Sequence, residues 1–175
     1  VITKSEVLAF RAMFDYDSLG ATPNDSYDPN AISATIREWP AHGDDAMGQS
    51  PYLAPFYDAN HNGLYEWESG DYPYYDFDND LCPRTLKAQW GRQYTSHVAT
   101  TLETEAGIVT GGLLSDQVLK GDQTIWWVFN DMGNVHTESK GQPIGMEIRA
   151  QAFAFSTNDQ INNMTFYDQI GRAGQ

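Results

Sequence analysis

The sequence contains a single cysteine, Cys82, and no long run of apolar residues. One cysteine cannot form a disulfide within this chain, and it does not by itself identify the compartment. No segment approaches the roughly 18 apolar residues that a membrane-spanning helix needs, so we expect no direct insertion into a membrane. We interpret Cys82 as structural, because no histidine pattern typical of a catalytic cysteine surrounds it.

Positive charge is also scarce. The chain has 10 Lys and Arg residues against 24 Asp and Glu residues, a formal net charge of -14. Such a field repels nucleic acid and anionic membrane surfaces, so neither is an expected partner. Acidity can serve solubility alone, but the acids gather between Asp58 and Asp80, and this clustering favours the binding of divalent cations.

The length of 175 residues suits a single module with its own core. The chain begins at Val1 and has no charged-then-apolar leader, so we expect a piece of a longer, multidomain secreted protein. Residues 76–120 show no clear hydrophobic period, and we interpret them as an insertion.

Two short helices are predicted near the N-terminus. The first covers residues 3–14, where Thr3 and Glu6 have the spacing of a capping box. The second covers residues 28–39 and ends before a proline, which disfavours helix at the preceding position. The polar, turn-rich residues 15–27 between them are predicted to form a loop.

The last third of the chain predicts β-strands at residues 124–130, 144–157 and 164–170. The first has apolar side chains on both faces, which predicts burial on both sides. The long irregular segment 40–73 is rich in aromatic residues, so we expect a bound metal to order it. The predicted fold is mainly β, an antiparallel sandwich-like module with two short helices and calcium-stabilised loops.

The segment from Asp58 to Asp71 has the spacing of a calcium loop. Oxygen-bearing side chains stand at alternate positions, and Gly63 follows where the chain must turn sharply. An EF-hand would carry a bidentate glutamate at position 12, where this chain has Ser69. Glu68 and Asp71, which lie on either side of that position, are the two acids expected to replace it. The alternative is an Asn-Gly turn with solvated acids. The predicted calcium ligands are Asp58, Asn60, Asn62, the Leu64 carbonyl, Glu66, Glu68 and Asp71.

A second acidic group consists of Asp76, Asp78 and Asp80. These carboxylates alternate correctly, but no glycine follows them and Pro83 stiffens the exit. The group is interpreted either as a second metal site or as a solvated acidic turn.

Four further residues offer an enzymatic alternative, a carbohydrate-active or peptidase-type domain. His42 and Asp44 would have to meet His136 and Glu138 in space to form an acid–base or transition-metal site. The other interpretation is that these side chains hydrogen-bond the backbone of loops. Because no spacing resembles a zinc-protease helix, a role without catalysis is favoured.

The tryptophans raise a third possibility, a sugar-binding module. The periodic placement of Trp39, Trp126 and Trp127 predicts that they belong to the core. Trp67 and Trp90 are then the two candidates for exposed platforms on which sugar rings stack.

Several longer motifs stand in a fixed order along the chain. They are WPAHGD at residues 39–44, YLAPFYD at 52–58, NGLYEWESGDYP at 62–73, GDQTIWWVFND at 121–131, HTE at 136–138, GMEI at 145–148, AFAF at 152–155 and NNMTFY at 162–167. This series resembles the N-terminal region of large secreted surface proteins of Bacteroidota that are exported by type IX secretion.

The resemblance implies an extracellular or outer-membrane cell-surface location and a structural or adhesive role. It implies further β modules and a sorting domain in the same longer chain, with extracellular or cell-surface proteins or glycans as possible partners. It supplies no catalytic residues. Asp17-Ser18-Leu19 is also similar to a short sequence that is glycosylated on exported proteins of such bacteria, which implies a glycoprotein.

Overall fold

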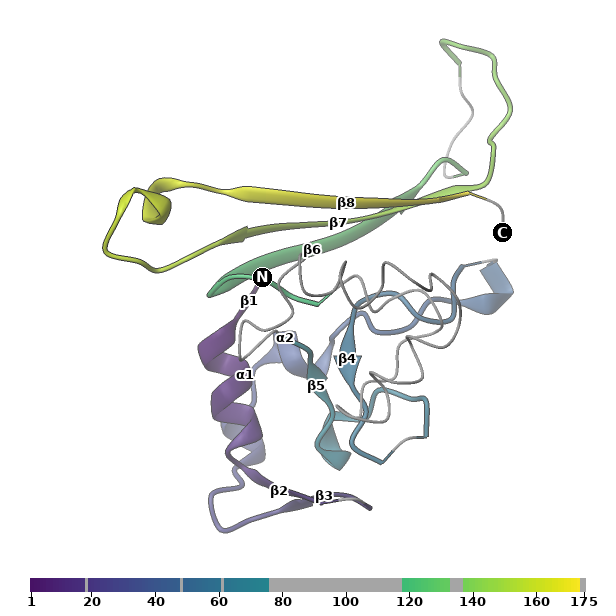
Figure 1. The fold of residues 1–175 in the computed structure, drawn as a ribbon. Coiled ribbons are helices and arrows are strands. Elements are labelled where there is room, and N and C mark those ends of the chain that lie inside the picture. The colour runs from purple at the N-terminus through teal and green to yellow at the C-terminus, as the bar shows by residue number, and fades with distance from the viewer. Residues whose placement is uncertain (18, 48, 61, 76–117, 133–136, 174–175) are drawn as a thin grey trace, which may run out of the picture.

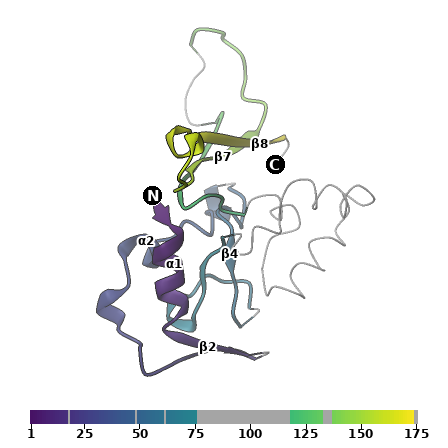
Figure 2. The same cartoon turned by 60° about the vertical axis from the view of Figure 1, so that its left-hand side comes forward.

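The computed structural model describes residues 1–17, 19–47, 49–60, 62–75, 118–132 and 137–173 (Figure 1). One antiparallel sheet of four strands, in the order β1-β6-β7-β8, lies across a body of short helices, small ladders and loops. A view turned by 60° keeps the sheet on one side of the body, so the two form separate layers (Figure 2). Most of the predicted insertion lies outside the described residues.

Helix α1 (Lys4–Arg11) begins at the predicted capping box. The Glu6 backbone N–H donates to Thr3 Oγ1 at 3.2 Å, and the Thr3 N–H donates to the Glu6 carboxylate at 3.0 Å. These two bonds satisfy N–H groups that the first turn leaves without helical partners. Strand β1 (Ile2–Thr3) pairs with β6, so the same residues that start the helix also connect it to the sheet.

The segment predicted as a loop at residues 15–27 contains a β-hairpin instead. Strands β2 (Phe14–Asp17) and β3 (Gly20–Pro23) pair in antiparallel register. Along β2 the aromatic side chains are turned inward and the aspartates outward, the period of two that a half-buried strand requires. The alternating stretch of β2 is only four residues long, so the turn residues around it hide the pattern in the sequence.

The predicted helix at residues 28–39 is divided into two shorter pieces. The 3₁₀ turn η1 (Pro29–Ala31) is capped by Asp28, and helix α2 (Ala34–Arg37) is capped by Ser33. The predicted buried face is confirmed: Ile32, Ile36 and Trp39 are all buried.

A two-residue ladder stands at the base of the acidic loop. Strand β4 (Phe56–Tyr57) pairs with β5 (Tyr72–Pro73), and the rings of Tyr57 and Tyr72 stack with centroids 4.7 Å apart. The other short elements are the 3₁₀ turns η2 (Asp45–Met47), η3 (Trp67–Ser69) and η5 (Gln160–Asn163), and a bridge between Tyr75 and Leu119.

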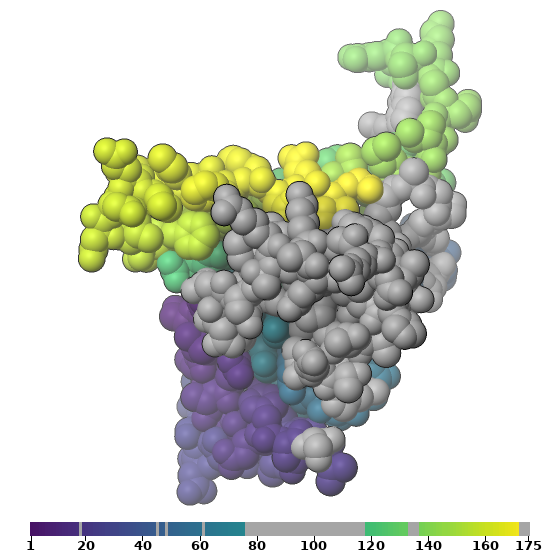
Figure 3. Space-filling view, viewed as in Figure 1, coloured from purple at the N-terminus to yellow at the C-terminus, as the bar shows by residue number. Residues whose placement is uncertain are grey.

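The long strands are β6 (Gln123–Asn130), β7 (Met146–Ala154) and β8 (Phe166–Ala173). They confirm the three strands predicted from the sequence, with shifted ends. The register pairs Trp127 with Ala150 and Ala150 with Gln169. The tip of the β7–β8 hairpin projects beyond α1 (Figures 1 and 3).

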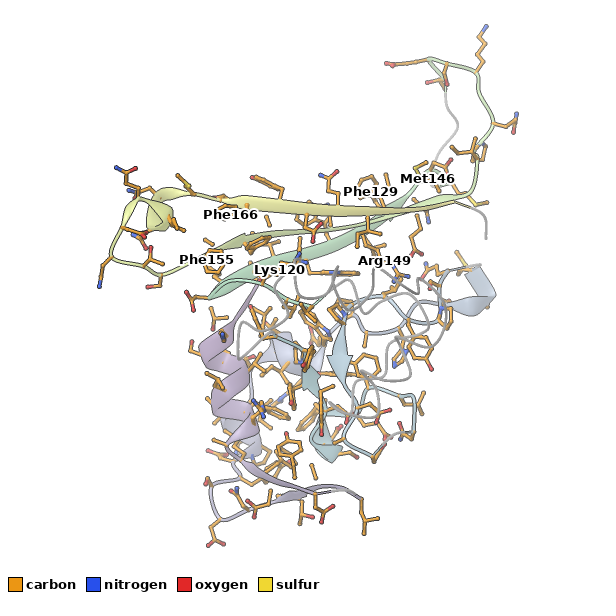
Figure 4. All side chains as sticks on the ribbon, viewed as in Figure 1. Lys120, Phe129, Met146, Arg149, Phe155 and Phe166 are labelled. Atoms are coloured by element: carbon orange, nitrogen blue, oxygen red, sulfur yellow. The ribbon has the colours of Figure 1, made fainter. Side chains whose placement is uncertain are left out.

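The sheet face toward the body carries polar side chains that are buried. Thr124, Arg149 and Gln151 each donate a hydrogen bond to a carbonyl oxygen of irregular backbone, on Lys120, Tyr52 and Val118 respectively. Arg149 lies between the sheet and the body (Figure 4). Carbonyl groups of loops do not accept hydrogen bonds from a neighbouring strand. A sheet that packs on loops therefore needs side chains that donate hydrogen bonds to these carbonyls.

The opposite face, called here the outer face, is apolar and partly open. Ile125 is 47% exposed and Phe129 is 48% exposed, so the prediction that β6 is buried on both sides is wrong. Trp127, predicted to lie in the core, is half-buried on this face. The described side chains of the outer face carry no charge; the positions are Gln123, Ile125, Trp127, Phe129, Met146, Ile148, Ala150, Ala152, Ala154, Tyr167, Gln169 and Gly171.

The hydrophobic core lies beneath the sheet, between α1, α2 and the β4–β5 ladder. It comprises Ile2, Val7, Phe10, Phe14, Ile32, Ile36, Trp39, Ala41, Ala54, Phe56, Tyr72, Tyr75 and Leu119, with Trp126 packed against it. The coarse prediction is therefore confirmed: the fold is mainly β, with antiparallel sheets and two short helices. Among the described residues, no helix is long and apolar enough to cross a membrane.

The buried ion pair of the sheet yields a stability prediction. Arg149 contacts the Glu147 carboxylate at 2.6 Å and donates to the Tyr52 carbonyl at 2.7 Å. Arg149→Met should lower the free energy of unfolding by about 3–5 kcal/mol, because it leaves the Glu147 charge buried without its cation. Urea unfolding followed by circular dichroism measures the change.

The double variant Glu147→Gln with Arg149→Met is the matched control. It removes both charges, so it should be clearly more stable than Arg149→Met alone. Losses that simply add in the double variant would show that the two side chains do not depend on each other.

Candidate metal centre

The acidic loop is closed at its base by the β4–β5 ladder. Asp58 directly follows β4 and Asp71 directly precedes β5, so the ladder brings the two ends of the loop together. Both aspartates are completely buried. The pairing therefore places two carboxylates inside the protein at the same end of the loop.

Side chains within the loop turn the backbone at alternate residues. The Asn62 N–H donates to Asn60 Oδ1 at 3.1 Å, and the Leu64 N–H donates to Asn62 Oδ1 at 2.8 Å. The Gly63 N–H donates to Asp58 Oδ2 at 2.7 Å. Gly63 has φ of +81°, a conformation that other residues adopt only under strain. The predicted alternation and the sharp turn at the glycine are both present.

Asp71 joins the two halves of the loop. The Ala59 N–H donates to its Oδ1 at 2.8 Å, and the Glu66 N–H donates to its Oδ2 at 2.7 Å. Of the two acids expected to replace a position-12 glutamate, Asp71 is the one inside the loop. Glu68 lies exposed on η3 and makes no hydrogen bond or ion pair to another described residue.

The Glu66 carboxylate is directed at the loop's amides. Its Oε2 accepts from Asn62 Nδ2 at 2.6 Å and from Asn60 Nδ2 at 3.4 Å. The structure therefore brings together Asp58, Asn60, Asn62, Glu66 and Asp71, five of the seven predicted ligands, around one short loop. Leu64 belongs to the same turn through its backbone.

The electrostatics of the loop are set by three acids, Asp58, Glu66 and Asp71. Burial raises the pKa of Asp71 to about 7, although the N–H groups of Ala59 and Glu66 act in the opposite direction, and the charges of Asp58 and Glu66 raise it further. Across the described part of the chain, no Lys, Arg or His forms an ion pair with any of these three acids. A cation would relieve their mutual repulsion.

The donors present suit a hard cation. Each amide or carboxylate oxygen that accepts one backbone N–H keeps a second lone pair. Within the described ranges, no three His, Cys, Asp or Glu side chains converge as a metal cluster. The loop would instead combine carboxylates with amide and backbone oxygens, which is how flexible calcium sites are built and is unlike a nitrogen- and sulfur-rich zinc site.

The residues of the enzymatic alternative have other partners. His42 Nδ1 lies 2.9 Å from the Pro51 carbonyl oxygen, and its Nε2 accepts from the Tyr65 N–H at 2.9 Å. Asp44 is exposed and accepts from the Ala46 N–H. Residues 137–145, which include Glu138, form an arm on the outer side of the sheet (Figures 1 and 2), while His136 lies outside the described residues.

The candidate sugar platform is covered on one side. The Arg37 guanidinium lies over the Trp67 ring, 5.3 Å from its centroid, and the tryptophan is half-buried. Trp90 and the acidic group Asp76, Asp78 and Asp80 lie outside the described residues. Leu19 of the glycosylation motif is exposed at the β2–β3 turn, but Ser18 itself is not described.

Comparison of the chain with protein-family models, with curated proteins and with solved structures gave no match. The assignment of the loop therefore depends on the residues and contacts described above.

Two contacts reach the loop from outside it. The interpretation that His42 hydrogen-bonds loop backbone is confirmed, although the sequence did not identify its partners, and the contact made by Tyr16 was missed. His42 hydrogen-bonds the Tyr65 backbone, and the Tyr16 hydroxyl donates to the Gly70 carbonyl at 2.9 Å. Both contacts join segments more than 20 residues apart. The WPAHGD motif contains the histidine, but only the fold shows what its ring does.

The raised pKa of Asp71 predicts how the metal-free protein responds to pH. In the unfolded chain this carboxyl titrates near its ordinary value of about 4, whereas in the folded protein its pKa is about 7. The folded state therefore holds the proton over a pH range where the unfolded state has lost it. Stability in chelator should fall as the pH rises from about 4 to 7 and then level off.

Urea midpoints measured at a series of pH values in chelator test this prediction. Saturating calcium should remove the fall, because the bound ion favours the ionised carboxylate. Asp71→Asn should flatten the profile in chelator. An unchanged fall in that variant would assign the effect to another group.

Proposed function

We propose that the chain is a calcium-stabilised structural or adhesive module of a secreted or cell-surface bacterial protein. The observation that carries the proposal is the pair Asp58 and Asp71, both completely buried at the base of a loop with alternating oxygen donors. Two carboxylates in that position remain ionised at low cost only with a cation close by.

Calcium fits the donor set better than magnesium. The loop offers carboxylate, amide and carbonyl oxygens on a backbone without regular structure, an arrangement suited to the larger and less demanding ion. The proposed ligands are Asp58, Asn60, Asn62, the Leu64 carbonyl, Glu66 and Asp71. Glu68 is left out because its carboxylate makes no hydrogen bond to the other residues of the loop, unlike those of Asp58, Glu66 and Asp71.

The ion would stabilise the folded conformation of a segment that is otherwise irregular. Extracellular calcium loops bind at about 10⁻⁴–10⁻³ M. At free calcium tenfold above Kd, binding stabilises the folded state by about 1.4 kcal/mol. That is a substantial part of a typical total stability of about 5–15 kcal/mol. The proposed extracellular location agrees with this need, since calcium is plentiful there.

The outer face supports the sandwich-like architecture expected from the sequence. Three long strands, each about eight residues and about 4.8 Å from the next, cover roughly 14 Å by 26 Å. An uncharged patch of that size is often functional. The proposed partner is the apolar face of a second sheet from another module of the same longer polypeptide.

Thermal melting tests whether calcium stabilises the fold. The melting temperature should rise by roughly 3–6 °C between chelator and saturating calcium, the shift that about 1.4 kcal/mol produces in a domain of this size. Asp58→Asn should abolish the shift because it removes one of the buried charges. Isothermal titration calorimetry should show one site in the parent protein.

Two matched variants make that test specific. Glu68→Ala removes an exposed acid of the same loop, and Asp25→Ala removes an exposed acid outside it; both should keep the calcium shift. A parent protein whose melting temperature ignores calcium would overturn the proposal. A shift that survives Asp58→Asn would overturn the ligand assignment.

The outer face is tested by a charge placed on it, at Phe129 near the end of β6. In the 175-residue chain, Phe129→Lys should change the free energy of unfolding by less than about 0.5 kcal/mol, since Phe129 is half-exposed. In a longer chain that carries the neighbouring module, the same change should be destabilising by at least about 2 kcal/mol. Phe10→Ala, in the core, should be destabilising in both. Equal small effects of Phe129→Lys in both chains would contradict the proposed covering.

A further inference from the structure

One side chain from outside the acidic loop is directed at its backbone. His42 belongs to the segment that follows Trp39, and its Nε2 accepts from the Tyr65 N–H at 2.9 Å. Its Nδ1 lies 2.9 Å from the Pro51 carbonyl oxygen. A carbonyl only accepts and a backbone N–H only donates, so both bonds exist together only in the neutral imidazole with its hydrogen on Nδ1.

The ring is also fixed by packing. Its centroid lies 5.3 Å from that of Phe56 and 5.5 Å from that of Tyr52. Two hydrogen bonds and two aromatic neighbours leave the imidazole little freedom to rotate. Nε2 therefore stands as a fixed acceptor beside the loop.

The Tyr65 N–H shares its peptide group with the Leu64 carbonyl. The structure has no cis peptide bond among its described residues, so this peptide is trans and planar, and the Leu64 oxygen points opposite to the N–H, away from His42. No described residue donates a hydrogen bond to that oxygen. The donating N–H also polarises the group and makes the oxygen a stronger ligand.

The next peptide is held in the same way. The Glu66 N–H donates to Asp71 Oδ2 at 2.7 Å, and the Tyr65 hydroxyl donates to the Ile36 carbonyl at 2.6 Å. Tyr65 is thus fixed at its own N–H, at the N–H that follows and at the end of its side chain. The orientation of the Leu64 carbonyl depends on the first of these.

We propose that His42 is a positioning residue of the calcium loop: its Nε2 sets the plane of the Leu64–Tyr65 peptide so that the Leu64 carbonyl serves as a ligand. The inference rests on the proposed calcium site. Groups that orient metal ligands from outside the coordination sphere commonly change metal affinity 10- to 100-fold when they are removed.

Three variants separate positioning from packing. His42→Leu fills the space without an acceptor, whereas His42→Gln places an amide oxygen near the position of Nε2. Phe56→Leu loosens the ring's packing and leaves the hydrogen bond in place. Circular dichroism in chelator establishes that each variant is folded, and calorimetry gives its calcium affinity.

The decisive readout is the number of water molecules on a terbium ion bound in place of calcium, obtained from luminescence lifetimes in H₂O and D₂O. His42→Leu should weaken calcium binding about tenfold and add about one coordinated water, because the Leu64 carbonyl no longer faces the ion. His42→Gln should restore most of the affinity and the parent hydration. Phe56→Leu should lower the melting temperature and leave the hydration unchanged.

The outcomes distinguish the two proposals. A parent protein that binds neither calcium nor terbium would overturn the metal site itself. A parent protein that binds, together with a folded His42→Leu variant of equal affinity and hydration, would overturn the role of His42 alone. If His42→Leu does not fold, the comparison of His42→Gln with His42→Asn decides, because the shorter asparagine places its amide near Nδ1 and cannot reach the Tyr65 N–H. The proposal predicts the extra water in His42→Asn alone, and equal hydration in the two variants would overturn it.

Discussion

The burial of Asp58 and Asp71 at the base of one loop is the constraint on which the lower half of the molecule depends. Both carboxylates are inaccessible to water, and both are satisfied by backbone N–H groups of the loop. Those hydrogen bonds, and not a ladder of paired strands, determine the path of the chain between β4 and β5. They do not neutralise the charge, and burial, followed by the charges of Asp58 and Glu66, raises the pKa of Asp71.

The same loop is linked to the rest of the fold through aromatic and polar contacts. Tyr57 and Tyr72 stack across its base, and Tyr16 of the β2–β3 hairpin packs edge-on against both. Burial raises the pKa of all three hydroxyls, so they remain neutral donors. On the other side, the segment held by His42 carries the Tyr52 carbonyl to which Arg149 of the sheet donates. The conformation of the loop and the packing of the sheet on the body are therefore connected through this segment.

The parts of the fold that follow from local patterns could be read from the sequence. The capping box at Thr3, the buried face with Ile36 and the three long strands are set by residues close together in the chain. So is the oxygen spacing of the acidic loop, because each Asx turn spans two residues. Asp71 rather than Glu68 closes the loop because the β4–β5 ladder, a contact across the whole loop, determines which acid is turned inward.

Other features could not be predicted, because they depend on what each face meets. On β7 the alternation of polar and apolar side chains is plain in the sequence, and ordinary experience places the apolar side inward. Here Arg149 is buried while Ile148 is only half-buried, because the sheet rests on loops whose carbonyls need donors. Periodicity identifies two faces but not the layer that each one contacts. The role of His42 is hidden for the same reason: its partners, Pro51 and Tyr65, are defined only once the loop has closed.

Charge connects the loop to the compartment in which the protein is proposed to function. A net charge of -14 opposes compaction, but salt at physiological strength screens interactions beyond about 8 Å, so distant surface acids contribute little to that repulsion. The carboxylates of Asp58, Glu66 and Asp71 are different, since they lie together within a loop and partly out of water, where screening is weak. A divalent cation offsets most of their three charges at the place where repulsion is strongest. In a calcium-poor compartment the loop would retain that repulsion, so the fold would reach its full stability only where calcium is available.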